Sequence, residues 1–207
     1  MSDLAARVLE RARAAGAPVT ANLAAQAAEY LALLARWNER INLTGFSLSP
    51  PDDAAIDRLI VEPLAAAQFV APTDRTVVDV GSGGGSPALP LKMARPDLSF
   101  LLVESKSRKV AFLREAARTL HLDRVEAEAT RLETLVARPT RQAAADVVTI
   151  RAVRIDAAFL DVLKTLLRPG GRVFVFTGAD NSSTAWPSAA EVHDLVPSRR
   201  SRLIVLV

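Results

Sequence analysis

The spacing of hydrophobic positions changes partway along the chain. Before about residue 72, apolar side chains recur with the period of an amphipathic helix, and Thr20 is placed to cap the second such stretch. After residue 75, short apolar runs alternate with amphipathic stretches, which is typical of βαβ units around a parallel sheet. The change predicts a helical N-terminal extension, residues 1–72, packed on an α/β domain, residues 73–207.

The element boundaries follow from these runs and from the breaking residues between them. The predicted strands are residues 77–80, 100–103, 125–128, 147–150, 173–177 and 203–207. The predicted helices are residues 4–15, 21–42, 56–69, 88–95, 107–120, 132–137 and 157–167, with a kink near Pro63 in the third. Loops are predicted at residues 47–53, 169–171 and 179–201. The expected fold is Rossmann-like, a mostly parallel sheet with helices on both faces.

The most informative stretch for function is VVDVGSGGG, residues 77–85, where a predicted strand carrying Asp79 runs into a glycine-rich turn. Gly81 and Gly83 permit backbone angles closed to other residues and let a ligand approach the main chain. Glu104 ends the next predicted strand, about 20 residues beyond the turn, where a carboxylate would meet a ribose hydroxyl. The pattern predicts a pocket for a nucleoside-bearing cofactor.

Two departures from the dinucleotide-binding pattern narrow the choice of cofactor. Ser86 stands where that pattern has its third glycine, and Asp79 would repel a pyrophosphate. The same carboxylate suits a ligand with an ammonium or sulfonium group, and S-adenosylmethionine carries both. We therefore expect this methyl donor rather than a nicotinamide nucleotide. A tight strand-to-helix turn without a ligand is the alternative.

Further residues are expected at the same edge of the sheet. Right-handed crossovers bring the carboxyl ends of parallel strands together, so Asp79, Glu104, residues 129–133 and Arg151 should converge on one crevice. The apolar run before Arg151 aims its side chain there. A basic helix is predicted after Glu104. Its basic residues are either a solvated helix face or a phosphate-binding surface, and the sequence does not decide between the two.

Composition excludes several kinds of chemistry. The chain has no cysteine, which removes disulfides, iron–sulfur chemistry and a cysteine nucleophile, and its two histidines are too scattered for a metal cage. We expect no metal. No apolar stretch approaches the ~20 residues that span a bilayer, so we expect a cytoplasmic protein without a membrane partner. The formal charge of +3 permits a polyanionic partner.

Four stretches together resemble one known family. They are WNERINLT at 37–44, DVGSGGGSPALPLKMARPD at 79–97, ESKSRKVAFLRE at 104–115 and IRAV at 150–153. The chain is similar in these stretches to the GidB/RsmG family of class I methyltransferases. This family makes 7-methylguanosine in small-subunit (16S) ribosomal RNA with S-adenosylmethionine.

The resemblance implies a set of cofactor contacts and a partner. The donor would contact residues at four strand ends: Gly81, Ser86, Glu104, Ser105, Lys106, Leu132, Glu133 and Arg151. The interpretation of the glycine turn adds Asp79 and Gly83 to the expected cofactor-binding set. Residues 73–207 would form the methyltransferase domain, and the partner would be ribosomal RNA or the small-subunit particle. A monomer is expected, and no catalytic residue is assigned. Guanine N7 carries a free lone pair, so methyl transfer to it needs alignment rather than a base.

Several positions depart from the family on the substrate side. Its usual histidine is Leu59 here, its serine is Pro63, and a lysine near the end of the fifth strand is Thr177. Cofactor binding is therefore better supported than the RNA target. A small-molecule methyltransferase and a protein that holds donor or RNA without turnover remain as alternatives.

Overall fold

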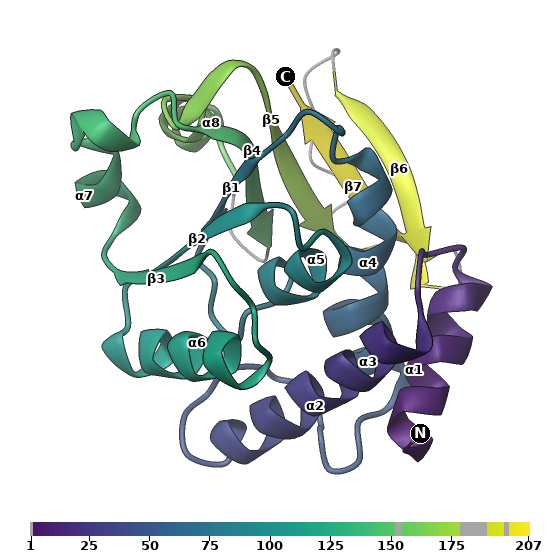
Figure 1. Ribbon diagram of the computed structural model, residues 1–207. Helices are drawn as coiled ribbons and strands as arrows, with labels where there is room; N and C mark the ends of the chain where they lie inside the picture. Colours follow the sequence, from purple (N-terminus) through teal and green to yellow (C-terminus); the bar gives the residue numbers. More distant parts are fainter. Residues whose placement is uncertain (1, 152–154, 179–189, 197–198) are drawn as a thin grey trace.

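A seven-stranded sheet forms the centre of the molecule, with strand order β3-β2-β1-β4-β5-β7-β6 (Figure 1). The computed structural model describes residues 2–151, 155–178, 190–196 and 199–207. The strands are β1 (Thr76–Val80), β2 (Ser99–Glu104), β3 (Val125–Ala129), β4 (Ala145–Arg151), β5 (Leu167–Thr177), β6 (Glu191–Val196) and β7 (Ser201–Leu206). β1 to β5 are parallel, whereas β7 runs antiparallel to β5 and β6. The predicted mostly parallel sheet is confirmed.

Helices cover both faces of this sheet, as predicted. The α-helices are α1 (Asp3–Ala14), α2 (Ala21–Asn38), α3 (Asp53–Ile56), α4 (Glu62–Ala66), α5 (Ala88–Ala94), α6 (Ser107–Thr119), α7 (Leu132–Val136) and α8 (Ala157–Lys164). Shorter helical turns are the π-helix η1 (Asp57–Val61) and the 3₁₀-helices η2 (Ala67–Phe69) and η3 (Pro139–Arg141). α7 and α8 pack on one face, and α4, α5 and α6 on the other.

The alternation of side chains along each strand determines to which face of the sheet each side chain points. Val77 packs in the larger core, under α4, α5 and α6, whereas Val78 and Val80 pack in the smaller core, under α7 and α8. Because side chains alternate with a period of two, Asp79 points to the same face as Val77. The same count in β4 places Arg151 on this face. The polar residues of the predicted crevice therefore share one side of the sheet.

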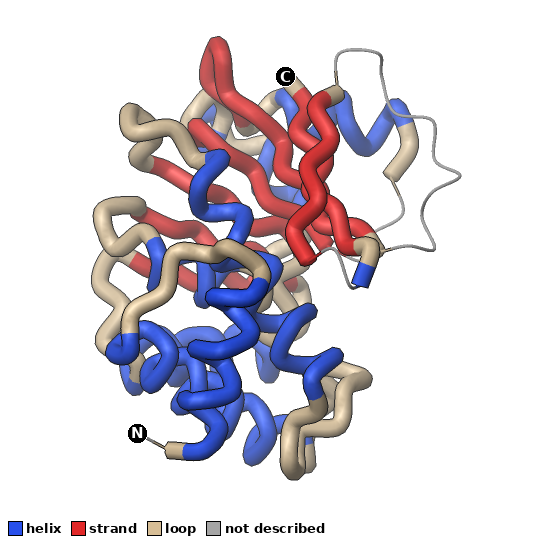
Figure 2. Tube along the Cα trace, turned by 90° about the vertical axis from the view of Figure 1, so that its right-hand side faces the viewer, coloured by secondary structure: helices blue, strands red, loops and turns tan. Residues whose placement is uncertain are grey.

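The N-terminal helices are part of the larger core. Tyr30, Leu31 and Leu34 of α2 are buried in the same cluster as Val77 and Phe100 of the sheet. Figure 2 shows these helices gathered beneath the strands, at the end of the molecule that carries the N-terminus. The division of the chain at residue 72 stays a prediction, since the extension and the sheet share this hydrophobic cluster.

The third predicted helix starts earlier than expected. The prediction placed a loop at 47–53 and the helix at 56–69, but α3 begins at Asp53 because the Asp52 side chain accepts a hydrogen bond from the Ala55 N–H, 2.7 Å away. The helical run then passes through η1, α4 and η2 and ends at Phe69. The predicted irregularity near Pro63 takes the form of a π-helical turn immediately before α4.

Three other boundaries differ from the prediction. α2 ends at Asn38 rather than at residue 42, because the Asn38 side chain bonds with the backbone of the following loop. β5 begins at Leu167 rather than at residue 173, and residues 169–171 form a bulge in it, so that Leu167 pairs with Ala145 and Arg172 with Val147. In the predicted excursion 179–201, β6 forms at 191–196, while 179–189 and 197–198 lie outside the described residues.

Candidate functional site

The glycine turn lies at the point where the connections of the sheet reverse direction. From β1 the chain continues to β2 on one side, and β4 is the neighbour of β1 on the other side. Ligands of open parallel sheets bind at such a point. Gly81 and Gly83 adopt φ angles of 75° and 50°, which disfavour residues with a Cβ. The Gly81 N–H donates to the Val103 carbonyl, 2.9 Å away, and this bond holds the turn against β2.

Asp79 is a buried carboxylate beneath this turn. Its Oδ1 accepts a 2.6 Å hydrogen bond from the Thr149 hydroxyl on β4, the residue with which Asp79 pairs in register. Its Oδ2 is buried and has no partner among the described residues. Burial raises the pKa of Asp79 to about 6, although the Thr149 bond opposes that rise. A cationic ligand group would supply the missing partner.

Glu104 ends β2 beside the turn and bonds to it directly. Its Oε2 accepts a hydrogen bond from the Gly83 N–H, 3.1 Å away, and its Oε1 accepts one from the Lys106 N–H, 2.9 Å away. The Ser105 hydroxyl lies 3.4 Å from the same Oε1. Glu104 therefore connects the glycine turn to the start of α6. Its contact with a ribose hydroxyl stays a prediction.

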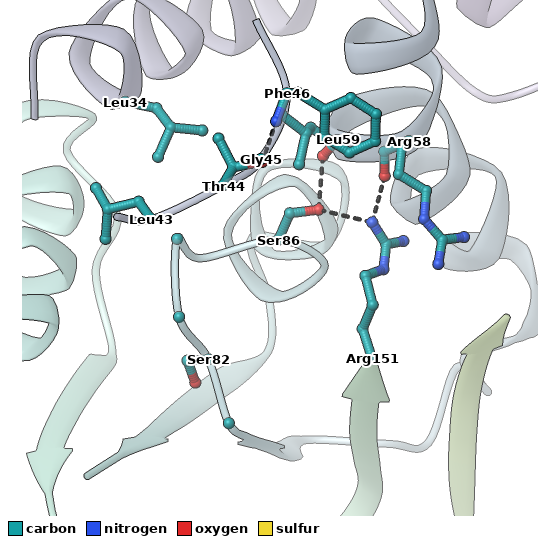
Figure 3. Close-up of a pocket in the computed structure, with 13 residues that line it drawn as sticks. Leu34, Leu43, Thr44, Gly45, Phe46, Arg58, Leu59, Ser82, Ser86 and Arg151 are labelled. Carbon is teal, nitrogen blue, oxygen red and sulfur yellow. Dashed lines mark hydrogen bonds between the residues drawn. The ribbon is translucent and has the colours of Figure 1, made fainter. Parts of the chain in front are cut away.

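Arg151 connects the other side of the turn to the helical run above it (Figure 3). Its Nη1 donates to the Arg58 carbonyl and to the Ser86 hydroxyl, the latter 3.2 Å away. Its Nη2 lies 2.9 Å from the buried carboxylate of Glu62, and the guanidinium stands 4.8 Å from the centre of the Phe176 ring. The Ser86 hydroxyl donates in turn to the Leu59 carbonyl, 2.8 Å away.

Burial changes the protonation behaviour of this cluster. Desolvation lowers the pKa of Arg151 to about 10, and the nearby carboxylate of Glu62 opposes this shift. Desolvation also raises the pKa of Glu62, while Arg151 and Arg58 hold it down. At neutral pH, Arg151 therefore stays a cation with a fixed orientation, paired with Glu62.

A cavity of about 390 Å³ opens between the turn and the helices. It is lined by Leu34, Leu43, Thr44, Gly45, Phe46, Arg58, Leu59, Gly81, Ser82, Gly83, Gly84, Ser86 and Arg151. Asn38 shapes one wall: its Oδ1 accepts hydrogen bonds from the N–H groups of Leu43 and Thr44, at 2.8 and 3.0 Å. These hydrogen bonds hold the wall of the cavity in place.

The structure brings together part of the predicted cofactor set. Gly81, Gly83, Ser86 and Arg151 line the cavity. Asp79 and Glu104 lie next to it and bond to its surroundings, as described above. Ser105, Lys106, Leu132 and Glu133 do not line it. Leu132, the first residue of α7, is buried in the smaller core and Glu133 is exposed, so their contact with a donor stays a prediction.

Sequence reasoning missed several residues that shape the site. Thr149 carried no signal beyond its place in an apolar strand, and pairing with Asp79 appears only once the sheet register is known. Glu62 is an acidic residue in an apolar helix, 1% exposed, and that unusual placement was the available signal. Leu43 and Thr44 lie in the stretch 37–44, which was noted only for the family resemblance, and Gly45 and Phe46 lie just beyond it.

A second hollow of about 770 Å³ lies between the end of α2 and α6. Arg36, Arg40 and Arg108 line it together with Trp37 and Glu115. The loop after α2 joins this hollow to the cavity, since residues 39–41 border the one and residues 43–46 the other. On α6, Arg114 is occupied in structure, because it donates two hydrogen bonds to the Ala127 carbonyl.

Two features are absent from the described part of the chain. None of its helices is long and apolar enough to cross a membrane. It contains no group of three or more histidine, aspartate or glutamate side chains placed to hold a metal ion.

Solved structures with the same fold are S-adenosylmethionine-dependent and related methyltransferases. A SAM-dependent methyltransferase from Aquifex aeolicus aligns with a TM-score of 0.55 at 16% identity, covering 74% of this chain and 93% of that one. An O-methyltransferase family protein from Burkholderia thailandensis aligns with a TM-score of 0.52 at 19% identity, covering 73% and 57%. At such identities the likeness shows a shared class I methyltransferase fold.

Sequence comparison identifies the family. A protein named ribosomal RNA small subunit methyltransferase G from Roseiflexus is 36% identical over 84% of this chain and 73% of its own. One of the same name from Chloroflexus aggregans is 31% identical over 97% of this chain and 87% of its own. The family model for GidB, described as rRNA small subunit methyltransferase G, matches residues 23–193. The chain therefore belongs to the GidB family of small-subunit rRNA methyltransferases.

Proposed function

We propose that this protein transfers a methyl group from S-adenosylmethionine to guanine N7 in small-subunit (16S) ribosomal RNA. The proposal rests on the buried Asp79 carboxylate beneath the glycine turn, with one oxygen bonded to Thr149 and the other without a partner among the described residues, in a chain of the GidB family. A buried, unpartnered carboxylate oxygen is costly unless a ligand or water completes it. The ammonium group of the donor would do so.

The site residues fit this donor. Asp79 offers the acceptor for a cationic group, the turn at Gly81 and Gly83 permits close approach, and Glu104 offers carboxylate oxygens at the neighbouring strand end. Ser86 and Arg151 form the wall nearer the helices. Ser105, Lys106, Leu132 and Glu133 complete the proposed set at the outer edge, as the family resemblance implies.

The proposed reaction does not require the protein to remove a proton from the guanine N7 acceptor. The bound donor supplies a methyl group on a positively charged sulfur, and guanine N7 attacks with a lone pair that carries no proton. The residues must therefore align the two ligands and exclude water. Leu34, Leu43 and Phe46 provide apolar walls for that purpose. Arg151, held by Glu62 and Ser86, offers a fixed cation at the place where the guanine would enter.

The decisive experiment follows the label from methyl-labelled donor. The protein is incubated with unmethylated small-subunit particles, with the naked RNA, and with no RNA, and the RNA is digested to nucleosides. Label in 7-methylguanosine supports the proposal. Label transferred only to small metabolites would support a small-molecule methyltransferase, and donor binding without transfer to any of them would support a binding protein.

The cofactor site has a separate test. Gly81→Leu places a side chain in the turn and should abolish donor binding in calorimetry. Gly170→Leu is the matched control, because Gly170 has a φ of 79° against 75° for Gly81 but lies at the exposed bulge of β5. Binding by Gly81→Leu as strong as that by the control would refute the assigned pocket.

A further inference from the structure

Pro63 stands immediately after the π-helical turn that overlies the cavity. The Glu62 N–H donates to the Asp57 carbonyl, five residues back, which is the π-helical pattern. Residue 63 would next donate to the Leu59 carbonyl in an α-helix, or to the Arg58 carbonyl in a π-helix. Proline has no N–H, so neither carbonyl receives a hydrogen bond from this position.

These two carbonyls are the ones that hold the site. The Arg58 carbonyl accepts from Arg151 Nη1, and the Leu59 carbonyl accepts from the Ser86 hydroxyl at 2.8 Å. Both Arg58 and Leu59 line the cavity, opposite the glycine turn. A backbone carbonyl accepts from these side chains most readily when no helical N–H competes for it.

We propose that Pro63 is a positioning residue for methyl transfer: by withholding an N–H, it leaves the carbonyls of Arg58 and Leu59 to fix the side chains of Arg151 and Ser86 at the cavity. Glu62 completes the arrangement, since its carboxylate lies 2.8 Å from Arg58 and 2.9 Å from Arg151. The π-turn thus presents two carbonyls and one carboxylate to the same guanidinium and hydroxyl. This role rests on the proposed function.

The test is Pro63→Ala, which adds one N–H to a helix that alanine otherwise favours. That N–H competes for the Leu59 carbonyl and frees Ser86, whose hydroxyl then no longer holds Arg151. We expect kcat for RNA methylation to fall about tenfold, the effect of one lost hydrogen bond. Pro139→Ala, on the exposed turn η3, is the control for loss of a proline and should leave kcat unchanged.

A second variant separates the N–H from the stiffness of the proline ring. In this variant, residue 63 has the methyl side chain of alanine, but its backbone N–H is replaced by an ester oxygen, so residue 63 has no hydrogen to donate. If the free carbonyls matter, this ester variant restores kcat to within about twofold of the wild type. If ring stiffness matters, it stays as slow as Pro63→Ala, and the proposal is wrong.

The third measurement does not depend on activity. In nitrogen-labelled protein, a guanidinium held on several sides rotates slowly, and we expect separate Nη signals for Arg151, identified by their loss in Arg151→Lys. Pro63→Ala should merge these signals. Unchanged Arg151 signals together with unchanged kcat would overturn the proposal, even if the melting temperature shifts. If the wild type transfers no methyl group, the proposed function fails, while the Nη signals still decide the role of Pro63.

Discussion

The carboxylate of Asp79 and the hydroxyl of Thr149 lie 2.6 Å apart, on residues that face each other in the parallel strands β1 and β4. Among the described residues, Thr149 donates the hydrogen bond to Asp79 Oδ1, and Asp79 Oδ2 has no partner. This bond holds one carboxylate oxygen in place and leaves the other oxygen free, so the orientation of Asp79 is set before any ligand arrives.

Donor binding should depend on pH through Asp79. Burial raises its pKa to about 6, so the carboxylate is ionised at pH 8 and mostly protonated at pH 5. Because a protonated carboxyl attracts an ammonium group poorly, we expect the donor Kd to be constant above pH 7 and to rise up to tenfold for each pH unit below 6. Calorimetric titration from pH 5 to 8 measures this. Asp79→Asn should bind weakly at every pH, and a normal rise of Kd in that variant would exclude Asp79 as the cause.

The same group makes the ligand-free protein less stable as pH rises. The folded-state pKa of Asp79 is about 6 against an ordinary 3.8, so folding favours the protonated form. The stability that this preference adds is complete below pH 3.8 and is lost as pH rises through 6, a total of about 3 kcal/mol. Asp79→Asn should remove this loss and melt above the wild type at pH 8 without donor. Denaturant unfolding of both proteins between pH 4 and 8 checks the sign.

Thr149→Val should weaken donor binding without disturbing the core. Valine keeps the shape of threonine but removes the hydrogen bond, which is worth ~1.5–3 kcal/mol with a charged partner. We expect the pKa of Asp79 to rise further, the midpoint of the pH profile to move above 6, and the donor Kd at pH 7 to increase by roughly 2- to 15-fold. Thr177→Val is the control, because Thr177 is also buried in the sheet but donates to the Gly178 carbonyl. Equal effects of the two variants would contradict a specific role for Thr149.

Asp57 should be a stability residue rather than a site residue. It is 1% exposed and accepts hydrogen bonds from Arg11 at 2.6 Å and from Arg199 at 2.9 Å. The remaining partners Arg11 and Arg199 are 25% and 43% exposed, so the loss is that of hydrogen bonds to a charged group, ~1.5–3 kcal/mol, and Asp57→Ala should lower the melting temperature by roughly 3–12 °C. Asp53→Ala removes an exposed partner of the same Arg11 and should cost less than ~1 kcal/mol. Donor affinity should be normal in both variants below their melting temperatures.

The second hollow supplies a prediction about RNA. Arg36, Arg40 and Arg108 line it, and the loop after α2 connects it to the cavity. If RNA phosphates lie there, Arg40→Gln and Arg108→Gln should each make the slope of log K for RNA binding against log salt concentration shallower by about 0.7. Both variants should leave donor affinity unchanged. Arg13→Gln, an exposed arginine on α1, should change neither quantity. An unaltered salt dependence in both test variants would exclude this surface.

Sequence patterns predicted the sheet and the glycine turn because both depend on local signals. The period-two runs and the breaking residues between them located the strands that surround Asp79 and Glu104. The alternation within β4 placed Arg151 at the expected edge. The contacts of Ser86 and Arg151 with the Arg58 and Leu59 carbonyls could not be predicted, because they join segments far apart in sequence.

Residue 63 shows what a comparison of side chains leaves out. Against the family pattern, Pro63 counts as a loss on the substrate side, since a side chain with a hydroxyl is replaced by one without. The proposed positioning role depends instead on the missing backbone N–H of Pro63, which no comparison of side chains reports. Similarly, β6 was absent from the prediction because residues 191–196 lie at the end of a polar, proline-containing stretch, and pairing with β7, which the sequence does not show, stabilises them as a strand.

The hydroxyl of Tyr30 on α2 donates to the Gly84 carbonyl, 2.6 Å away, in the middle of the glycine turn. Loss of this bond would leave a buried phenol without an acceptor, so α2 and the turn cannot shift independently. If RNA is held at the end of α2, thermodynamic linkage runs in both directions: the factor by which the donor changes RNA affinity through this contact is the factor by which RNA changes donor affinity. We therefore expect the binding of each substrate to change the affinity for the other.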